Sequence, residues 1–284
     1  MSDPNLSETL RRFRAAHRAE QLQVGAVRWE LVSGGDAAEC LLILTGASGI
    51  GELGFTHLMA LKDRYRVLLP SYPPVSSMAE LADGLDAVLG SAGIGRAHVL
   101  GGSFGGLVAQ CFVRRHPRRV ASLILSHTGL PRPRRTRGIR LALGLVPWIP
   151  TFVLRWAMHR EALRLLPSEH PDFSFWRAYF RDIFARLAKR DILARYRCIL
   201  DLDSNYVFSP ADTADWAGPV LMLQSDDDPL VSATDRAALA ALYPQAQVKT
   251  FHGTGHAAAL VAPELYRETV CEFLRQARRT AGQP

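Results

Sequence analysis

The chain has few of the features that mark disulfide-rich, metal-binding or membrane-spanning proteins. It contains only four cysteines among 284 residues, and no two of them form a C-x-x-C pair. A disulfide framework or a zinc site is therefore not expected. The longest uncharged apolar stretch, residues 141–154, is too short to span a bilayer and contains two prolines. The N-terminal segment is polar and lacks the apolar core of a secretory signal, so we expect a cytoplasmic protein.

Acidic residues are outnumbered by basic ones, 27 to 34, which gives a formal net charge of +7. Such a charge favours an anionic partner. The candidates are nucleic acid, an anionic membrane surface and an acidic substrate such as a CoA thioester. The chain has no recognised nucleic-acid-binding module, and its basic and aromatic residues do not interleave, so we expect no nucleic acid. No motif implies a metal or an organic cofactor.

Apolar runs and helical patterns alternate along most of the chain. A continuous apolar run that ends at glycine, such as residues 40–46, is typical of a buried parallel strand. Strands that alternate with helices predict an α/β protein with a mostly parallel sheet wrapped by helices. We predict strands at residues 24–32 (an edge strand), 40–46, 65–73, 96–102, 120–129, 219–225 and 247–253. We predict helices at residues 6–20, 77–89, 104–115, 233–242 and 263–278.

Residues 131–218 break this alternation and contain several helical patterns without a strong strand. We predict an α/β core formed by residues 1–130 and 219–284, with a helical cap inserted at 131–218. The cap begins with arginines, and an apolar run containing Trp148 and Phe152 follows. Three interpretations stay open: a lid over acyl chains, a surface for peripheral membrane or protein contact, and a solvated arginine face beside a helix buried on the core.

A glycine-rich turn carries the first candidate catalytic residue. Gly101, Ser103 and Gly105 fit G-x-S-x-G between a predicted strand and a predicted helix. The serine of such a turn sits on a strained backbone, and we expect side chains at positions 101 and 105 to collide with neighbouring strands. The helix N-terminus would offer N–H groups to a developing oxyanion. The alternative is a glycine-rich turn with an incidental serine.

A serine nucleophile needs a histidine base and an acid that orients it. Asp226, Asp227 and Asp228 follow one predicted strand, and His256 follows the next, so the chain supplies the order serine, acid, histidine. Asp228 is the predicted acid, and Asp227 remains an alternative. We predict that His256 is the base and that His252 is structural.

The remaining candidate residues surround the expected oxyanion. Two N–H donors are needed, and we predict those of Phe104, directly after the nucleophile, and of Ala47, in the loop after the first buried strand. Candidate substrate-binding residues are Gly46, Ser48, His127 and Trp148.

The motifs LTGASG, GGSFGG, SDDDPLV and GTGH, in this order, resemble those of the α/β-hydrolase superfamily over residues 24–274. The resemblance implies the α/β-hydrolase fold with Ser103 at the nucleophile elbow. Where the superfamily often has His-Gly before the oxyanion loop, this chain has Thr45-Gly46.

Within that superfamily the chain is similar to the maspardin group in the stretches GGSFGGLVAQ, VASLIL, LVPWIPTFVL and DSNYVFSPAD. That resemblance implies a shared cap and an interaction role, whereas Asp228 and His256 favour catalysis. The leading hypothesis is a serine hydrolase that cleaves a small-molecule carboxylic ester or thioester through an acyl-enzyme. The alternatives are a non-catalytic interaction protein of maspardin type, or C–C hydrolysis, acyl transfer, or lyase or cyclase chemistry.

Overall fold

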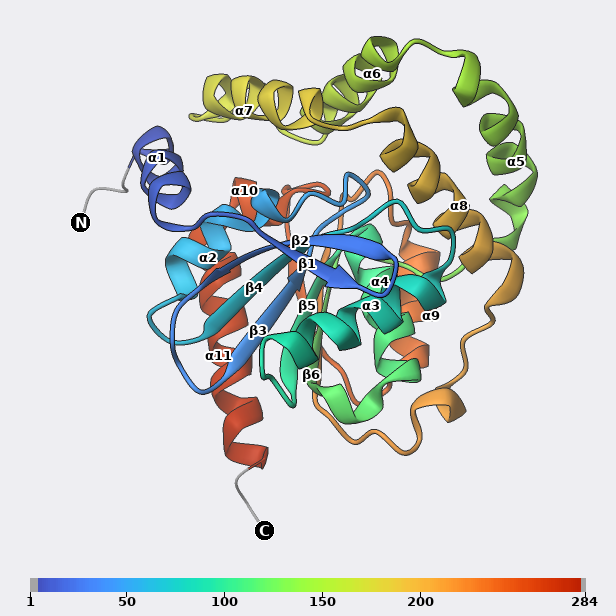
Figure 1. Ribbon diagram of the computed structural model, residues 1–284. Helices are drawn as coiled ribbons and strands as arrows, with labels where there is room; N and C mark the ends of the chain where they lie inside the picture. Colours follow the sequence, from blue (N-terminus) through green and yellow to red (C-terminus); the bar gives the residue numbers. More distant parts are fainter. Residues whose placement is uncertain (1–4, 282–284) are drawn as a thin grey trace.

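The protein is built on one eight-stranded sheet, shown in Figure 1 for the computed structural model, which describes residues 5–281. The strand order is β1-β2-β4-β3-β5-β6-β7-β8; β2 pairs antiparallel with both neighbours, and all other pairs are parallel. The predicted mostly parallel sheet is confirmed. The strands are β1 (Glu20–Val24), β2 (Val27–Gly34), β3 (Cys40–Leu44), β4 (Arg66–Ser71), β5 (Ala97–Gly102), β6 (Val120–Ser126), β7 (Val220–Ser225) and β8 (Gln247–Phe251).

Helices surround the sheet and also form a large insertion between β6 and β7. The α-helices are α1 (Leu6–Ala16), α2 (Phe55–Leu61), α3 (Met78–Ser91), α4 (Phe104–Arg115), α5 (Thr136–Leu145), α6 (Thr151–Arg164), α7 (Phe173–Ala185), α8 (Lys189–Asn205), α9 (Ala233–Leu242), α10 (Ala258–Val261) and α11 (Pro263–Ala281). Short 3₁₀ turns are η1 (Gly51–Gly54), η2 (Pro117–Arg119), η3 (Pro133–Arg135), η4 (Val146–Trp148) and η5 (Pro210–Thr213).

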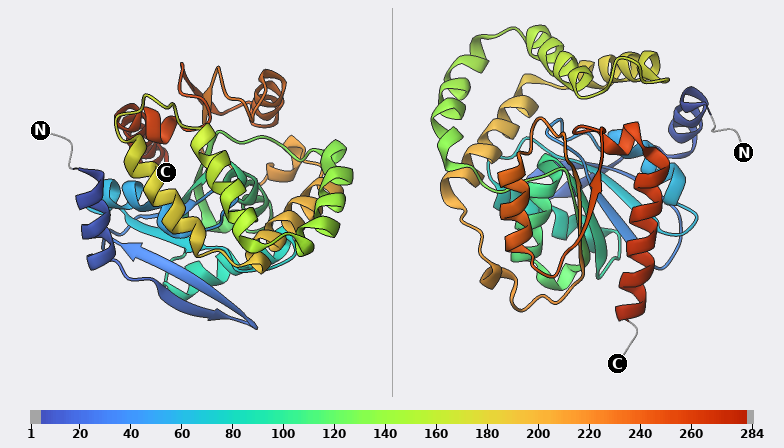
Figure 2. Two further views of the ribbon diagram at one scale, coloured as in Figure 1. Left: turned by 90° about the horizontal axis from the view of Figure 1, so that it is seen from above. Right: turned by 180° about the vertical axis from the view of Figure 1, so that it is seen from behind.

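The sheet has a separate apolar core on each face. Residues of α3, α4 and α9 contribute to one core, and residues of α1, α2, α7 and α11 contribute to the other. Figure 2 shows α9 and α11 on opposite sides of the strands. All five residues of β3 are buried, as expected for a strand covered on both faces. Each fully buried leucine of such a strand stabilises the fold by about 1.5–3 kcal/mol relative to an exposed one.

The predicted edge strand at residues 24–32 is wrong, because this segment contains a β-hairpin. β1 pairs with β2 around a two-residue turn, in which Gly25 has φ +57° and Val24 faces Val27. Glycine adopts a positive φ without steric cost, which permits the tight turn. β1 is therefore the edge strand, and β2 lies second in the sheet.

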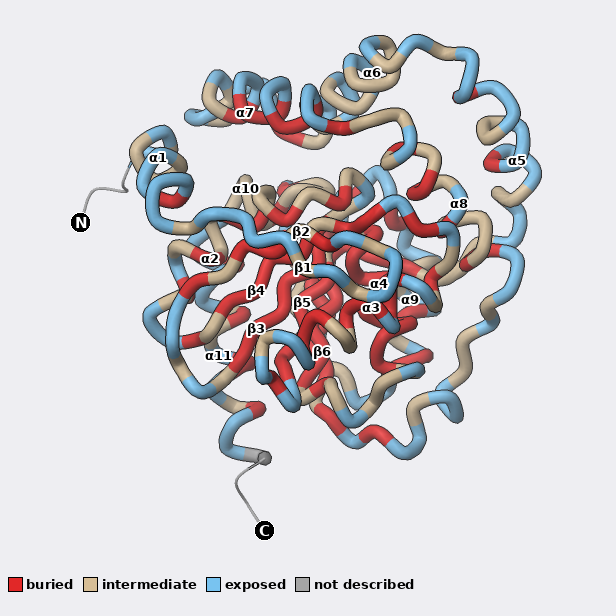
Figure 3. Tube along the Cα trace, viewed as in Figure 1, coloured by how far each residue is buried: buried red, intermediate tan, exposed pale blue. Residues whose placement is uncertain are grey.

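The insertion between β6 and β7 contains α5, α6, α7 and α8. The division into a core and a cap at residues 131–218 stays a prediction. Figure 1 shows α6 and α7 beyond the end of the sheet at which α10 lies. Asp203 of α8 is buried and fixes the start of the insertion: it accepts a hydrogen bond from the Arg132 N–H (2.7 Å) and pairs with the Arg135 guanidinium. Figure 3 shows more exposed residues along α5 and α6 than in the sheet.

Candidate active site

Ser103 lies between the end of β5 and the first residue of α4, in the predicted strand–turn–helix context. Its backbone has φ +52° and ψ −118°, a region that residues with a side chain rarely adopt. Such strain costs about 1–3 kcal/mol and persists only when the surroundings hold it in place. Here the Ser103 N–H donates to the Ser126 carbonyl (2.9 Å), and the Thr128 hydroxyl donates to the Ser103 carbonyl (2.8 Å).

The glycines around Ser103 are required by close backbone contacts. A Cβ at position 105 would lie 2.1 Å from the Leu44 carbonyl oxygen of β3, so the expected collision with a neighbouring strand is confirmed there. At position 101 a collision is also found, but the expectation that it involves a neighbouring strand is wrong. A Cβ there would lie 2.4 Å from the Gly105 carbonyl oxygen, in the first turn of α4 rather than in a strand. Gly101 thus lets α4 begin directly over β5.

The structure brings Ser103, His256 and Asp228 into one hydrogen-bonded chain. His256 Nε2 lies 3.0 Å from Ser103 Oγ, and His256 Nδ1 lies 2.8 Å from Asp228 Oδ2 and 3.0 Å from Asp228 Oδ1. The side chains of His256 and Asp228 are only 8% and 1% exposed. Both follow the ends of neighbouring parallel strands, where ligands bind in open α/β sheets.

The contacts of this chain determine which ring nitrogen carries the proton. An ionised carboxylate can only accept hydrogen bonds, so His256 Nδ1 is the donor to Asp228, and Nε2 is free to accept from the Ser103 hydroxyl. Burial by itself would raise the pKa of Asp228. The hydrogen bond and charge of His256 and the N–H groups of Leu230 and Val231 outweigh this, so the pKa lies below its ordinary value. Asp228 is thereby kept as the carboxylate.

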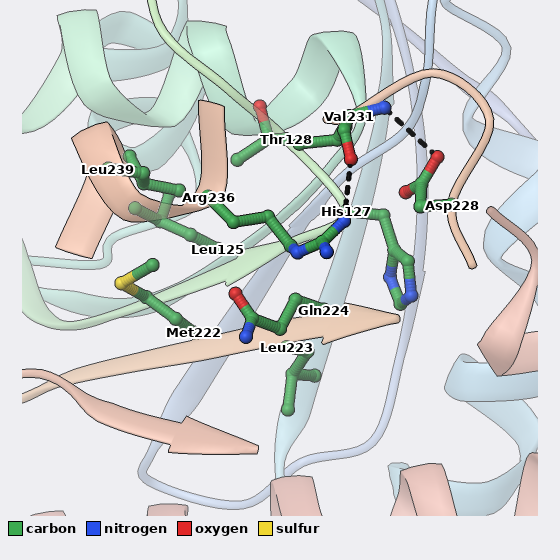
Figure 4. A pocket seen from close by; sticks show the side chains of 10 residues that line it. All are labelled: Leu125, His127, Thr128, Met222, Leu223, Gln224, Asp228, Val231, Arg236 and Leu239. Carbon is green, nitrogen blue, oxygen red and sulfur yellow. Dashed lines mark hydrogen bonds between the residues drawn. The ribbon is translucent and has the colours of Figure 1, made fainter. Parts of the chain in front are cut away.

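The loop after β7 fixes the position of the Asp228 carboxylate. The N–H groups of Leu230 and Val231 donate to Asp228 Oδ1 at 2.8 and 3.1 Å. The Arg236 guanidinium donates to the Val231 carbonyl (2.8 Å). Figure 4 shows this bond and the one from the Val231 N–H to Asp228, beside a cavity of roughly 10 Å³. Such a cavity can hold no more than about one water molecule. These supports were not predicted, and their one signal in the sequence is the turn at Pro229.

The other two aspartates have separate partners. Asp226 Oδ2 lies 2.7 Å from His252 Nδ1, and Asp227 Oδ1 accepts a hydrogen bond from the Gly255 N–H (3.0 Å). Asp227, the alternative acid, therefore holds the backbone beside His256 rather than its ring. The His252 side chain is 79% exposed and belongs to this surface pair.

The predicted oxyanion donors lie on the two loops next to Ser103. Among the described residues, neither the Ala47 N–H nor the Phe104 N–H has a hydrogen-bond acceptor, so both are available to a ligand. A Cβ at Gly46 would lie 3.8 Å from Ser103 Cβ, which places this loop directly beside the serine. The oxyanion role of Ala47 and Phe104 stays a prediction.

The loop that carries Ala47 is held by an aromatic side chain. The Tyr72 hydroxyl donates to the Thr45 carbonyl (2.9 Å), and the Tyr72 ring makes an edge contact with Phe104. The Gly49 N–H closes a turn on the Gly46 carbonyl (2.9 Å). The Thr45 hydroxyl is buried and has no hydrogen-bond partner among the described residues. Thr45-Gly46 thus keeps the glycine next to Ser103, in place of the His-Gly often found in the superfamily.

His127 lies beside the triad, with its ring centroid 5.8 Å from that of His256. It is buried and has φ +47°. Its Nδ1 lies 3.0 Å from Ser126 Oγ, and its Nε2 lies 2.8 Å from Ser225 Oγ. Burial is the largest cause that lowers the pKa of His127, to about 4, with the charge of His256 acting in the same direction. A neutral ring whose two nitrogens bond protein hydroxyls points to a supporting position behind His256.

The other predicted substrate-binding residues lie in two different places. Gly46 and Ser48 are partly buried in the loop beside Ser103. Trp148 is in η4 of the insertion, where it is 85% exposed. Substrate binding by Gly46, Ser48, His127 and Trp148 stays a prediction.

Comparison with known proteins agrees with this architecture. The family described as alpha/beta hydrolase fold matches residues 41–263. A protein of Caulobacter vibrioides named carbamate hydrolase RutD is 27% identical over 272 residues, which are 89% of this chain and 97% of that protein. A 2-hydroxy-6-oxononadienedioate/2-hydroxy-6-oxononatrienedioate hydrolase of Burkholderia vietnamiensis is 27% identical over 270 residues, which are 85% of this chain and 89% of that protein.

Solved structures show the same fold. The crystal structure of a hydrolase from Pseudomonas aeruginosa matches with a TM-score of 0.77 at 19% identity, covering 91% of this chain and 99% of that one. At this identity the likeness concerns the fold alone. The resemblance to the maspardin group stays a prediction.

Proposed function

The chain belongs to the alpha/beta hydrolase fold family, and we propose that within it the chain is a serine hydrolase that cleaves a carboxylic ester or thioester. The observation that carries the proposal is the hydrogen-bonded chain from Ser103 Oγ through His256 to Asp228. A histidine oriented by a buried carboxylate and within hydrogen-bond reach of a strained serine is the arrangement that activates a serine nucleophile.

Acylation follows from the geometry of the three side chains. The Ser103 oxygen attacks the acyl carbon while its proton moves to His256 Nε2, 3.0 Å away. Asp228 stabilises the imidazolium that forms, and the Ala47 and Phe104 N–H groups would bind the oxyanion. As the tetrahedral intermediate collapses, the imidazolium gives its proton to the leaving alcohol or thiol. The products of this step are the acyl-enzyme and the free leaving group.

Deacylation uses the same residues, with water as the nucleophile and Ser103 Oγ as the leaving group. His256 Nε2 removes a proton from water, whose oxygen attacks the acyl carbon of the Ser103 ester. The second tetrahedral intermediate breaks to release the carboxylic acid, and His256 returns the proton to Ser103 Oγ. The enzyme regains its starting state, and the net reaction consumes one water.

Hydrolysis of a carbamate or of a carbon–carbon bond is the second candidate function. It is favoured by the names of the two relatives that align over most of this chain, a carbamate hydrolase and a 2-hydroxy-6-oxononadienedioate hydrolase. Both reactions differ from ester cleavage in the atom that leaves the carbonyl carbon, which is nitrogen or carbon. The same serine, histidine and oxyanion donors could therefore carry out either reaction.

The first experiment is labelling of the folded protein with a fluorophosphonate, with mass spectrometry to locate the adduct. We expect stoichiometric modification of Ser103, abolished in Ser103→Ala and slowed at least about 100-fold in His256→Ala. The matched control is His252→Ala, since His252 lies on the surface beside Asp226 and its loss leaves labelling unchanged. Absence of labelling in a sample with a native circular dichroism spectrum would contradict the proposal.

A substrate panel separates the two candidate functions. The panel contains an oxygen ester and a thioester of one short acyl group, a carbamate of the same alcohol, and a vinylogous 1,5-diketone for carbon–carbon cleavage. The proposed function requires that the ester or thioester has the highest kcat/KM. A carbamate or diketone preferred by more than tenfold would assign the second candidate instead.

A further inference from the structure

An exposed apolar stripe runs along α5, η4 and α6 of the insertion. We call it the rim patch; it consists of Leu141, Leu145, Trp148, Phe152 and Trp156. Among the described residues nine large hydrophobic side chains are exposed, and five of them belong to this patch. The aromatic members are the most unusual, since Trp148 is 85% and Phe152 72% exposed. Scattered exposed apolar residues need no explanation, but a concentration of this kind marks an interaction surface.

The spacing of the rim patch accounts for its orientation. Leu141 and Leu145 lie one turn apart in α5, and Phe152 and Trp156 lie one turn apart in α6, so each pair shares one face of its helix. Trp148 lies in η4 between the two helices. The opposite side of the segment is used for packing: Ile139 and Val146 are buried, α5 contacts α8, and α6 contacts α7. The exposed fractions disagree with the interpretation of this run as a helix buried on the core. The segment has an inner apolar side that packs and an outer one that meets solvent.

Unpaired arginines flank the rim patch. Arg134, Arg137 and Arg140 precede or border its first members, and Arg160 follows the last; all four are exposed. Among the described residues none of the four forms a salt bridge, and the Arg160 guanidinium lies 5.5 Å from the centre of the Trp156 ring. The neighbouring arginines differ, because Arg132 pairs with Asp235 and Arg135 with Asp203. The charges at the patch are therefore left for an anionic partner.

We propose that the rim patch docks on the surface of an anionic phospholipid bilayer. Tryptophan and phenylalanine are suited to the headgroup region, where an apolar ring and nearby arginines are both accommodated. Within residues 5–281 no helix is long and apolar enough to cross a membrane, so the contact would be peripheral. A second copy of the chain fits less well, because a symmetric contact would bring the unpaired arginines of both copies together.

The position of the patch relates the bilayer to the candidate active site. Figure 1 shows α6 beyond the end of the sheet at which α10 lies, and α10 follows His256 directly. A bilayer docked on the rim patch would thus meet the same end of the molecule as the triad. This arrangement would let an acyl substrate that resides in the membrane reach the enzyme without crossing bulk water.

The test measures binding of the purified full-length protein to vesicles. One set contains equal amounts of phosphatidylglycerol and phosphatidylcholine, and the other contains phosphatidylcholine alone. Trp29, Trp176 and Trp216 are buried, so a blue shift of tryptophan emission would report on Trp148 and Trp156. We expect sedimentation with the anionic vesicles, a blue shift on binding, and weaker binding as ionic strength rises.

Two pairs of variants separate the patch from net charge. Arg137→Gln with Arg140→Gln is expected to weaken binding to anionic vesicles by about tenfold or more. The matched control is Arg118→Gln with Arg267→Gln, which removes the same charge from exposed arginines that form no salt bridge within residues 5–281, and leaves binding within about twofold. Trp148→Ser with Phe152→Ser is expected to weaken binding at least about tenfold and to remove most of the blue shift.

Three outcomes would overturn the proposal. The first is no sedimentation of the unaltered protein with anionic vesicles at low ionic strength. The second is an equal loss of binding in the two arginine pairs, which would show a general charge effect. The third is a dimer in solution that Trp148→Ser with Phe152→Ser converts to a monomer, which would assign the patch to a second copy. Folding of each variant is checked by its thermal unfolding midpoint, which exposed substitutions should leave within a few degrees.

Discussion

Asp228 holds His256 through both of its carboxylate oxygens, which lie 3.0 and 2.8 Å from Nδ1 of the ring. One of these oxygens also accepts the N–H groups of Leu230 and Val231. The carboxylate is thus fixed from the backbone side and can orient the imidazole without moving. Asp227, one residue earlier, is of the same residue type, but among the described residues its one hydrogen-bond partner is the Gly255 N–H.

Asp228→Asn is expected to lower kcat by about 10³–10⁴-fold, because an amide at this position no longer enforces the tautomer with the proton on Nδ1. Asp227→Asn is the matched control and should stay within about tenfold of the unaltered protein, since a neutral oxygen can still accept the Gly255 N–H. The measurement is steady-state hydrolysis of an activated ester. Equal losses in the two variants would contradict the assignment of Asp228 as the acid.

Ser103→Ala and Ser103→Gly should both abolish detectable ester turnover yet differ in stability. Alanine keeps the strain of φ +52°, whereas glycine relieves it. After allowance for the greater flexibility of glycine in the unfolded chain, we expect Ser103→Gly to exceed Ser103→Ala by about 1 kcal/mol in free energy of unfolding. Urea denaturation measures this difference. An alanine variant as stable as the glycine variant would show that the backbone at Ser103 is not strained.

Gly105→Ala is expected to lower the free energy of unfolding by at least about 2 kcal/mol, because the new Cβ would lie 2.1 Å from the Leu44 carbonyl oxygen. Gly102→Ala is the matched control. Gly102 lies two residues before the start of α4, and a Cβ there would meet nothing within 4 Å. It should change stability by no more than about 0.5 kcal/mol. Similar losses for both glycines would argue against close packing of α4 on β3.

Stability should depend on pH through His127, whose pKa burial lowers to about 4 in the folded protein. Above pH ~6.5 the ring is neutral in both states. Between pH ~6.5 and 4 the His127 ring is protonated in the unfolded chain but neutral in the folded protein. The free energy of unfolding therefore falls as pH falls. The total loss from this residue is roughly 3 kcal/mol and is complete below the folded pKa.

His127→Asn tests this dependence, because asparagine tolerates the positive φ at this position and does not titrate. The quantity compared is the fall in free energy of unfolding between pH 7 and pH 4, measured by urea denaturation. The fall should be smaller in the variant by roughly 2–3 kcal/mol, whatever the two absolute stabilities are. Parallel profiles would show that His127 takes up its proton alike in both states.

The buried strands and the triad order could be predicted because each rests on a local signal. The run of residues 40–44 is apolar throughout, and G-x-S-x-G needs only its own strand, turn and helix. The hairpin at Gly25 was missed because the alternating pattern continues through the two-residue turn. The choice between Asp227 and Asp228 stayed open because both follow the same strand, and only the loop that turns at Pro229 decides which carboxylate faces His256.

The surroundings of His127 and the exposure of the rim patch could not be predicted, because they depend on contacts between segments that are distant in the sequence. The Ser225 hydroxyl beside His127 Nε2 comes from β7, the neighbour of β6 in the sheet, and the sequence around His127 does not indicate this partner. The exposure of the rim patch is similar: the run from Leu141 to Phe152 is as apolar as a core strand, and only the fold leaves its outer side uncovered.

The insertion leaves the sheet after β6 and returns at β7, and these two strands are direct neighbours, with Leu123 beside Val220. The Leu123 N–H donates to the Pro219 carbonyl, so pairing resumes as soon as the chain re-enters. The hydrogen-bond register of the sheet therefore does not depend on the length or sequence of what lies between. In evolutionary terms, such an insertion can change without breaking the pairing of β6 with β7. Ser103, Asp228 and His256 all lie outside it.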